Sequence, residues 1–461
     1  MPKKFSFSLI LSLIISLSVS AQESGSFTLQ QAIEYAYQHQ AAVINAGIDE
    51  KIADAKVKEI IGMGLPQLSA SFDLKDFEKI PTQFIPDFLS PAIYHILKDE
   101  NLVQTEPANN NAVFPVQFGT RWNATAGLTA SQLIFQPSYL VGVQASKTYR
   151  EISRKNLTRT KIETSVAVSK AYYNALVSRE RFKLLEANVV RLQKLKDDTK
   201  ALYDNGFVEK IDYDRVVLAF NNVSTEKENV SRLLVLSDNL LKLQMGMDIG
   251  SPISLSDSLS SETIKNISMS VEKPDATKRI EYSMLETQKR ADMLILKNNR
   301  TGYIPSLVAY GSLSTSAQRD EFDIFSSGKK WYPTGLIGAT LSWNLFDGFQ
   351  REKKIQQAKL SLQKTENQML NATNAFTLEA EAARTQLMNS IASFNTQKEN
   401  LELANEVVRV TKIKYDQGVG SNLEVITAET SLREAQTNYY SALYDALINK
   451  VDYDRAMGAI K

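Results

Sequence analysis

Two acidic residues, Asp212 and Glu424, occupy matching places in a turn that occurs twice in the sequence. Each lies six residues after a glycine, Gly206 in YDNGFVEKID and Gly418 in YDQGVGSNLE. Carboxylates of like sign around a narrow opening attract cations and repel anions, so they can filter ions or bind divalent metals. A plainer interpretation is that each acid only complements the dipole at a helix N-terminus.

The same turns also carry a tyrosine three residues before each glycine, Tyr203 and Tyr415. Glycine at this place suits the left-handed cap that ends a helix, and Ser421-Asn422 offers an N-cap to the helix that follows. We therefore expect two helical hairpins whose tips are these turns. The cap explains the glycines, and it leaves the tyrosines and the acids without a role.

Other kinds of chemistry find little support. The chain has no cysteine, and its two histidines, His39 and His95, lie far apart in the sequence. P-loop, serine-hydrolase and zinc-protease motifs are absent, and basic residues do not cluster as they do in nucleic-acid-binding proteins. The sequence therefore predicts a protein that is not an enzyme, with no cofactor, no metal centre and no nucleic-acid partner.

The repeated turn belongs to a longer duplication. Matches at offsets of 211 or 212 residues pair Tyr203 with Tyr415, Met245 with Met457, and Gly127 with Gly338. Pro66 instead pairs with Pro305 at an offset of 239, so an insertion lies between Pro66 and Gly127. Two copies are too few for a solenoid. The sequence indicates one structural unit that is present twice.

Four segments follow from this pattern. Lys3 and Lys4, an apolar run from Phe5 to Val19 and small residues before Gln22 predict a signal peptide over residues 1–21, with an N-terminal anchor as the alternative. The first repeat then covers residues 22–250 and the second 273–461. The serine-rich stretch over 251–272 is interpreted as a linker or a small side subdomain.

Each repeat is expected to run helix, strand, strand, long helix, turn, helix. Leading helices are predicted over about 28–61 and 273–301, and return helices over 206–246 and 418–458. The long helices over 135–203 and 346–415 contain no proline beyond Pro137. Each would span about 100 Å at 1.5 Å per residue. Phe182, Leu185, Val189 and Leu192 follow the spacing of a coiled-coil seam.

The strands alternate between apolar and small polar residues. From Trp122 to Ala130, every second residue is apolar, and the residues between are small or polar. The segment from Ile337 to Leu345, which includes Trp343, repeats this pattern. About ten such residues suffice to cross a bilayer in a tilted strand. Because four strands cannot close a membrane barrel and an open edge in lipid leaves backbone groups unpaired, several copies must share one barrel.

With these features the chain resembles the TolC-like outer-membrane efflux proteins over essentially its whole mature length. The resemblance rests on the duplicated unit, on the strands led by Pro66 and Pro305, and above all on KYDQGVGSNLEVITAETSL, which is similar to the second periplasmic turn of that family. It implies a mainly α fold with a membrane β-barrel. Three chains would form a 12-stranded β-barrel that continues as a long α-helical barrel through the periplasm.

The resemblance also implies the partners. A homotrimer in outer membrane lipid would conduct substrates passively from an inner-membrane RND or ABC transporter through a periplasmic adaptor. Tyr203, Gly206, Tyr415 and Gly418 would then form the adaptor-docking turns, and Asp212, Arg215 and Glu424 the periplasmic gate or cation ring. The exported substrate is not implied.

Two positions depart from the pattern of some relatives at that gate. Gly420 stands where they have an arginine, and Thr427 stands where they have a second aspartate. Arg215 on the first turn is the residue that can supply a cation instead. The alternative to a channel is a soluble periplasmic coiled-coil scaffold or adaptor, and such a protein would lack the alternating strands.

Overall fold

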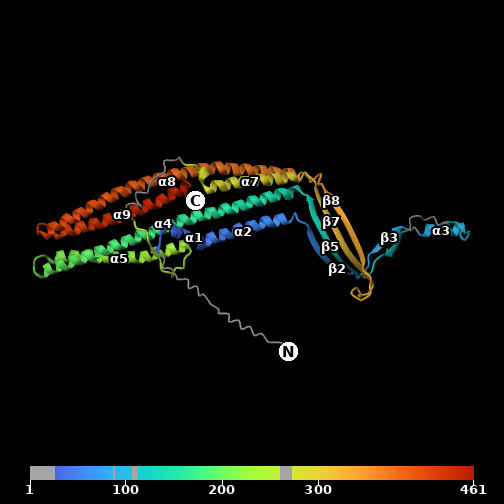
Figure 1. Cartoon of the computed structure of the whole chain (residues 1–461), viewed down its shortest axis with the longest axis horizontal. Helices are drawn as coiled ribbons and strands as arrows, with labels where there is room; N and C mark the ends of the chain where they lie inside the picture. Colours follow the sequence, from blue (N-terminus) through green and yellow to red (C-terminus); the bar gives the residue numbers. More distant parts are fainter. Residues whose placement is uncertain (1–25, 87–88, 106–112, 260–272, 461) are drawn as a thin grey trace, which may run out of the picture. The chain divides into compact units, whose positions relative to one another are not determined.

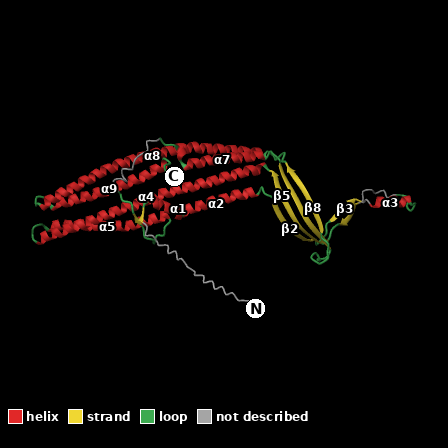
Figure 2. Ribbon diagram, in the orientation of Figure 1, coloured by secondary structure: helices red, strands yellow, loops and turns green. Residues whose placement is uncertain are grey.

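The computed structural model describes residues 26–86, 89–105, 113–259 and 273–460. The predicted signal peptide over residues 1–21 and part of the predicted linker, residues 260–272, lie outside the described residues. Helices dominate the described chain, with long ribbons and one larger sheet (Figure 2). None of the described helices is both long enough and apolar enough to cross a membrane.

The elements follow the predicted order twice along the chain (Figure 1). In the first half they are β1 (Ser26–Phe27), α1 (Leu29–His39), α2 (Ala41–Gly62), β2 (Gln67–Asp76), β3 (Thr82–Pro86), α3 (Leu89–Asp99), β4 (Val113–Gln117), β5 (Trp122–Phe135), α4 (Pro137–Asp204) and α5 (Lys210–Met245). In the second half they are β6 (Ser254–Leu255), a short 3-10 helix (Ala276–Lys278), α7 (Ile280–Thr301), β7 (Ser306–Arg319), β8 (Tyr332–Ser342), α8 (Gln350–Asp416) and α9 (Asn422–Ala456).

The long helices are confirmed, with 68 residues in α4 and 67 in α8. The predicted seam is confirmed as well. Leu185 and Leu192 of α4 are buried against Val223 and Val230 of α5, with Phe182 and Val189 packed beside them. Apolar residues at alternating spacings of three and four therefore join α4 to its return helix α5.

The first leading helix differs from the prediction, because it is broken at Gln40 between α1 and α2. Gln40 takes an extended backbone conformation, and its side-chain amide donates to the carbonyls of Leu243 and Gln244 at 3.2 and 3.3 Å. These carbonyls belong to the last turn of α5, where the regular helical hydrogen bonds end, and that of Leu243 also accepts from the N–H of Gly246 at 3.2 Å. A contact between segments about 200 residues apart thus decides the break.

The chain divides into two compact units. The first contains Met1–Ile52, Glu151–Lys289 and Lys364–Lys461, and the second contains Ala53–Arg150 and Arg290–Gln363. In the first unit, α1 packs on α4 and α5 around Ala32, Tyr172 and Leu241. The short strands β1 and β6 pair in parallel beside this core.

The second unit contains a four-stranded antiparallel sheet in the order β2-β5-β7-β8. Its register aligns the predicted alternation across all four strands. Leu68, Leu128, Leu313 and Leu341 stand on one face, with Ile337 on the same face and 95% exposed. The opposite face carries small and polar residues such as Ser69, Thr129, Ser312 and Thr340.

Two details of the sheet differ from the prediction. The last strand ends at Ser342, so Trp343 and Leu345 lie beyond it. The Trp343 indole donates to the carbonyl of Tyr303, in the connection from α7 to β7, at 3.1 Å. The predicted insertion is present between β2 and β5, where β3 and β4 form an antiparallel ribbon that carries α3.

Candidate functional site

The two repeated turns have the same backbone geometry. Gly206 ends α4 at φ +81°; its N–H donates to the carbonyl of Tyr203 at 2.9 Å, and the next N–H, of Phe207, donates to that of Leu202 at 2.9 Å. The turn at Gly418 repeats both bonds with φ +73°. This is the Schellman cap, in which glycine adopts the left-handed conformation without the strain of a Cβ. The predicted cap is therefore confirmed at both turns.

The turns lie together in the first unit and enclose a cavity of about 730 Å³. Phe207 from the first turn and Tyr415 and Gly418 from the second are among the residues that line it. The Tyr415 hydroxyl is buried, and among the described residues it has no hydrogen-bond partner. Tyr203 instead stacks on Tyr213, with ring centroids 6.1 Å apart. The two tyrosines thus have equivalent sequence positions and different surroundings.

Of the predicted gate residues, Asp212 and Arg215 pair with each other, whereas Glu424 has a different partner. Asp212 pairs with Arg215 of its own helix, with 3.4 Å between oxygen and nitrogen, while Glu424 pairs with Lys414 at 3.3 Å. Both acids stand in the first turn of a helix, as the dipole interpretation requires. No group of three metal-binding side chains occurs in the part of the chain that the structure describes.

The two departures from the family pattern have local causes. A Cβ on Gly420 would lie 2.9 Å from the backbone nitrogen of Tyr415, so the second turn has no room for a side chain there. The Thr427 hydroxyl donates to the carbonyl of Leu423 at 2.8 Å, within its own helix. Neither position can therefore contribute the contact that an arginine or an aspartate would make.

The sequence reasoning missed two apolar residues at the tips. Phe207 and Val419 each follow the turn glycine directly, and their exposed fractions are 78% and 74%. They lie 212 residues apart, at the same offset as the rest of the turn. That offset was the signal that could have identified them. Both tips thus expose an apolar side chain at the equivalent position.

It also missed a polar seam between the two hairpins. Asn188 of α4 donates to Gln436 of α9 at 2.9 Å, and Arg191 of α4 pairs with Glu429 of α9 at 3.0 Å. Near the tips, the Asn422 amide donates to the backbone carbonyl of Asp212 at 2.9 Å. Polar bonds thus join the two hairpins along this seam.

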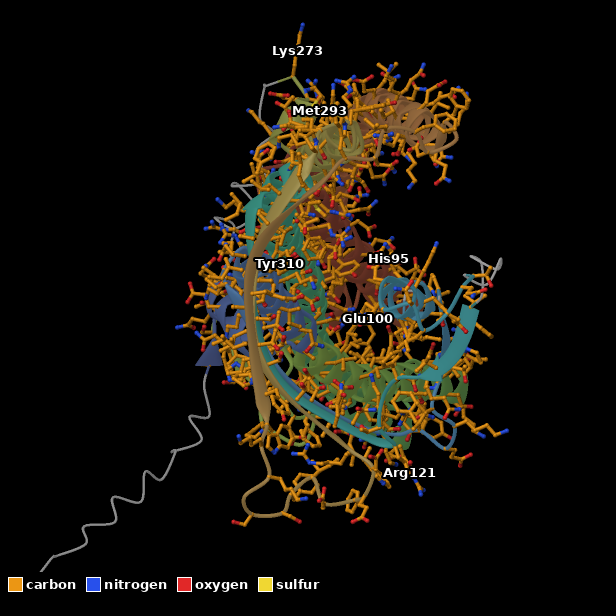
Figure 3. The ribbon with its side chains drawn as sticks, turned by 90° about the vertical axis from the view of Figure 1, so that its right-hand side faces the viewer. His95, Glu100, Arg121, Lys273, Met293 and Tyr310 are labelled. Carbon is orange, nitrogen blue, oxygen red and sulfur yellow. The ribbon has the colours of Figure 1, made fainter. Side chains whose placement is uncertain are left out.

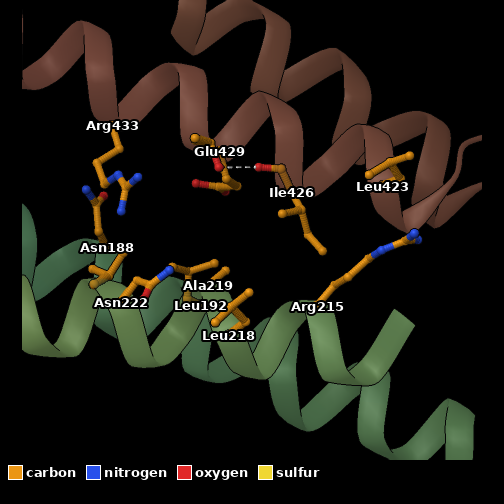
Figure 4. Close-up of a pocket in the computed structure, with 12 residues that line it drawn as sticks. Asn188, Leu192, Arg215, Leu218, Ala219, Asn222, Leu423, Ile426, Glu429 and Arg433 are labelled. Carbon is orange, nitrogen blue, oxygen red and sulfur yellow. Dashed lines mark hydrogen bonds between the residues drawn. The ribbon is translucent and has the colours of Figure 1, made fainter. Parts of the chain in front are cut away.

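Glu429 is the most buried acid in this seam. Burial raises the pKa of its carboxyl, and the charges of Arg191 and Lys412 lower it by less. A second cavity, of about 310 Å³, lies beside the seam, and Glu429 and Arg433 line its α9 side (Figure 4). Arg215 and Leu218 of α5 line the opposite side (Figure 4). A cavity therefore lies beside the seam, and the seam is stabilised by ionisable groups.

Comparison with known proteins bears on these features. The profile of the family described as Outer membrane efflux protein matches residues 296–459. The outer membrane protein TolC of Vibrio cholerae is 20% identical over 343 residues, which is 73% of this chain and 77% of the relative. The probable efflux pump outer membrane protein TtgC of Pseudomonas putida is 20% identical over 363 residues, covering 77% of this chain and 72% of its own.

Solved structures share the fold. The outer membrane protein VceC of Vibrio cholerae superposes with a TM-score of 0.68 at 16% identity, over 93% of this chain and 96% of VceC. The CmeC outer membrane channel of Campylobacter jejuni superposes with a TM-score of 0.70 at 14% identity, over 93% of this chain and 85% of CmeC. Through residues 296–459 the chain is similar to the Outer membrane efflux protein family, and it has the fold of the TolC-like channels. Its location is accordingly the outer membrane of a Gram-negative cell.

The burial of Glu429 predicts how the stability of this efflux protein depends on pH. The Glu429 carboxyl binds its proton more tightly in the folded protein than in the unfolded chain, because burial raises its pKa. Its contribution to the free energy of unfolding is therefore present at low pH and is lost as the pH rises above the ordinary pKa of glutamate. The melting temperature of Glu429→Gln relative to the parent protein should therefore increase between pH 4 and pH 8, measured by circular dichroism in detergent.

Arg191→Met provides the matched variant. It removes the cation that compensates the buried carboxylate, so the loss of stability with rising pH should become steeper. If the difference in melting temperature between the parent protein and Glu429→Gln stays constant over this pH range, burial does not raise the pKa of the Glu429 carboxyl.

Proposed function

We propose that this outer membrane efflux protein is a passive channel-tunnel formed by three copies of the chain. The observation that carries this proposal is the sheet of the second unit. One face is apolar and exposed, and the edge strands β2 and β8 each pair on one side only within the described residues. Such a sheet is incomplete in water and in lipid, because its apolar face and its edges both lack a partner.

Three copies would supply partners for the edge strands and would let the apolar face contact lipid. Pairing β8 of one chain with β2 of the next would join three four-stranded sheets into one 12-stranded barrel, and the smallest bacterial membrane barrels use eight strands. Leu68, Leu313 and Ile337 would then face lipid, while the polar face would line a water-filled lumen. The helices of the three copies would form the α-helical barrel. The soluble scaffold that was the alternative does not account for the exposed apolar face.

The transport role follows from the family. TtgC and the related ArpC are named as outer membrane proteins of efflux pumps. We infer that this chain receives its substrate from an inner-membrane RND or ABC transporter through a periplasmic adaptor, as in tripartite efflux or type I secretion. No energy-converting motif occurs in the sequence, so the partner supplies the energy.

The assembly is tested on detergent-solubilised protein. We expect the mass of a trimer by mass photometry, because a single four-stranded sheet leaves its edges open. Planar bilayers with the same preparation should show channel conductance. A monodisperse monomer that retains its strand content would contradict the proposal.

The repeated turns are proposed as the adaptor-docking surface. Three chains would present six similar tips, each with an exposed apolar residue, Phe207 or Val419, next to a bare glycine backbone. A Cβ at Gly206 or Gly418 would meet no atom within 4 Å, so a partner helix has open access to that backbone. Several weak contacts made together bind far more tightly than one contact does.

Replacing both Gly206 and Gly418 by Trp should abolish export and adaptor crosslinking and leave the yield of trimer unchanged. The matched control is the double replacement by Ala, which imposes the same backbone strain at positive φ without the bulk. Export is measured as resistance to a panel of toxic compounds in a deletion strain. If the Trp variant exports as well as the Ala variant, docking occurs elsewhere.

The acids are proposed as a ring around the periplasmic mouth. Within one chain Asp212 and Glu424 each pair with a cation, and three chains would supply six such carboxylates. Arg215, on the same helix as Asp212, would set how much of that charge remains uncompensated.

Replacing Asp212 and Glu424 together by Ala should reduce cation preference and block by multivalent cations in planar bilayers, since carboxylates interact more strongly in a narrow mouth than in bulk water. Glu434→Ala on α9 is the control for loss of an acid elsewhere. Unchanged selectivity and block would leave Asp212 and Glu424 with the helix-dipole role alone.

A further inference from the structure

The connection from β7 to β8, residues 320–331, folds back over the apolar face of the sheet, and we call it the β7–β8 loop. Its Ile324 is 1% exposed and is buried against Ala124 of β5 and Ala317 of β7. These two alanines are partners in the strand register and stand in line with Leu74 of β2 on the apolar face. Because burial of an isoleucine side chain is favourable, this contact holds the loop against the sheet.

Aromatic rings of the loop continue across the apolar face as far as the edge strand β2. The centroid of the Phe322 ring lies 4.7 Å from that of Trp122 on β5. The Phe325 ring lies 6.2 Å from that of Phe72 on β2 and 6.3 Å from that of Phe322. The loop therefore extends from its own strands over β5 to the edge at which the proposed trimer would join the next copy.

The outward side of the loop combines aromatic rings with charged groups. Three rings are more than half exposed: Phe322 (59%), Phe325 (67%) and Tyr332 (59%), the first residue of β8. Charged residues flank them in the sequence, with Asp320 and Glu321 before Phe322 and Lys329 and Lys330 before Tyr332. Rings bordered by charges are typical of the membrane–water interface, where the rings contact acyl chains and the charges stay among the hydrated head groups.

The loop lies at the end of the sheet that is distant from the long helices. Arg121, just before β5, is labelled at this end, away from Tyr310 (Figure 3). Its guanidinium lies 5.6 Å from the centroid of the Trp122 ring, which the loop also contacts. The helices α4 and α8 follow the opposite ends of β5 and β8. In the proposed channel these helices enter the periplasm, so the loop belongs to the outer leaflet.

The apolar face has the height of a membrane between the loop and its other border. That border lies beyond Leu307 and Leu341, which are register partners, and Trp343 and Phe346 follow there with exposed rings. Ala317, under the loop, comes ten residues after Leu307 on β7. At about 3.3 Å per residue this is about 33 Å along the strand, or about 25 Å across the membrane at a tilt of about 40°. Outer-membrane barrels have apolar bands about 25 Å tall, so the loop stands where the hydrocarbon ends.

We propose that the β7–β8 loop is a lipid-bound collar, which lies among the head groups of the outer leaflet and contacts lipid through Phe322, Phe325 and Tyr332. The inference rests on the proposed function, in which the apolar face of the sheet meets lipid in a trimeric barrel, and it extends that contact to the loop. Because each loop reaches the edge strand β2, three loops would surround the barrel and border the joints between copies. Rings at the interface resist movement into either phase, so the collar would fix the depth of the barrel.

The test places a fluorescent probe on the loop. The chain has no cysteine, so Phe325→Cys supplies one thiol per copy for an environment-sensitive dye, and the labelled protein is reconstituted into vesicles of phosphatidylcholine and phosphatidylglycerol. We expect emission at shorter wavelength than in water, and stronger quenching by nitroxide-labelled lipid than by iodide. The matched control is Gln318→Cys, at the same end of β7 on the polar face. Its probe should be quenched by iodide and not by the labelled lipid.

A second pair of variants tests the contact that holds the loop. Ile324→Asn in the Phe325→Cys chain should release the loop, because an amide buried against Ala124 and Ala317 would lack hydrogen-bond partners. Quenching by labelled lipid should then be lost. Ile324→Val in the same chain keeps an apolar side chain at this position and should retain the quenching.

The outcomes separate this inference from the proposed function. If the parent protein forms trimeric channels while iodide quenches the Phe325 probe as strongly as the Gln318 probe, the loop lies in water, and the inference fails while the proposed function stands. The inference also fails if neither quencher reaches the Phe325 probe, since protein would then cover the loop. A parent protein that forms no trimer would overturn the proposed function and this inference with it.

Discussion

The constraint on which the structure depends is that a β-sheet must find partners for its edges and for its apolar face. Each chain supplies only four strands, and the register places leucines and Ile337 on one face with serines and threonines on the other. In water the exposed apolar face is unfavourable. In lipid the unpaired backbone groups of the edge strands are unfavourable. A single chain cannot resolve both, and this is the reason why we propose that several copies share one barrel.

The helical elements obey a related rule at a different scale. Helices of 68 and 67 residues cannot bury themselves in a globular core. The long helix α4 packs on its return helix α5 through Leu185 and Val223, and the two hairpins meet through polar bonds such as Arg191 with Glu429. The hairpin cores are therefore apolar and firm, while the seam between the hairpins is polar and flanked by cavities. The stability of such a seam depends on the charge of the ionisable groups within it.

Duplication shapes how the sites are distributed. Both repeats retain the Schellman turn and an exposed apolar residue after the glycine, which makes the tips equivalent surfaces. The surroundings have diverged, since Tyr203 stacks on Tyr213 whereas the Tyr415 hydroxyl is buried beside a cavity. The connections at the end of the sheet have diverged further, into a short aromatic loop and a long segment with its own ribbon and helix. The equivalent elements thus carry the proposed docking surface, and the divergent ones are the connections at the end of the sheet.

The sequence alone determined the order of the elements, the length of the helices and the alternation of the strands. These properties follow from local rules, because periodicity, the absence of proline and the glycine caps act within a few residues. Tertiary structure decided what depends on contacts between distant segments. Gln40 breaks a helix because it caps α5, Gly420 is bare because the turn backbone fills the space beside it, and Glu429 is buried because two hairpins meet there. The sheet face that Ile80, Gln83 and Phe118 approach was likewise beyond any local pattern, since it depends on packing against strands that come from both repeats.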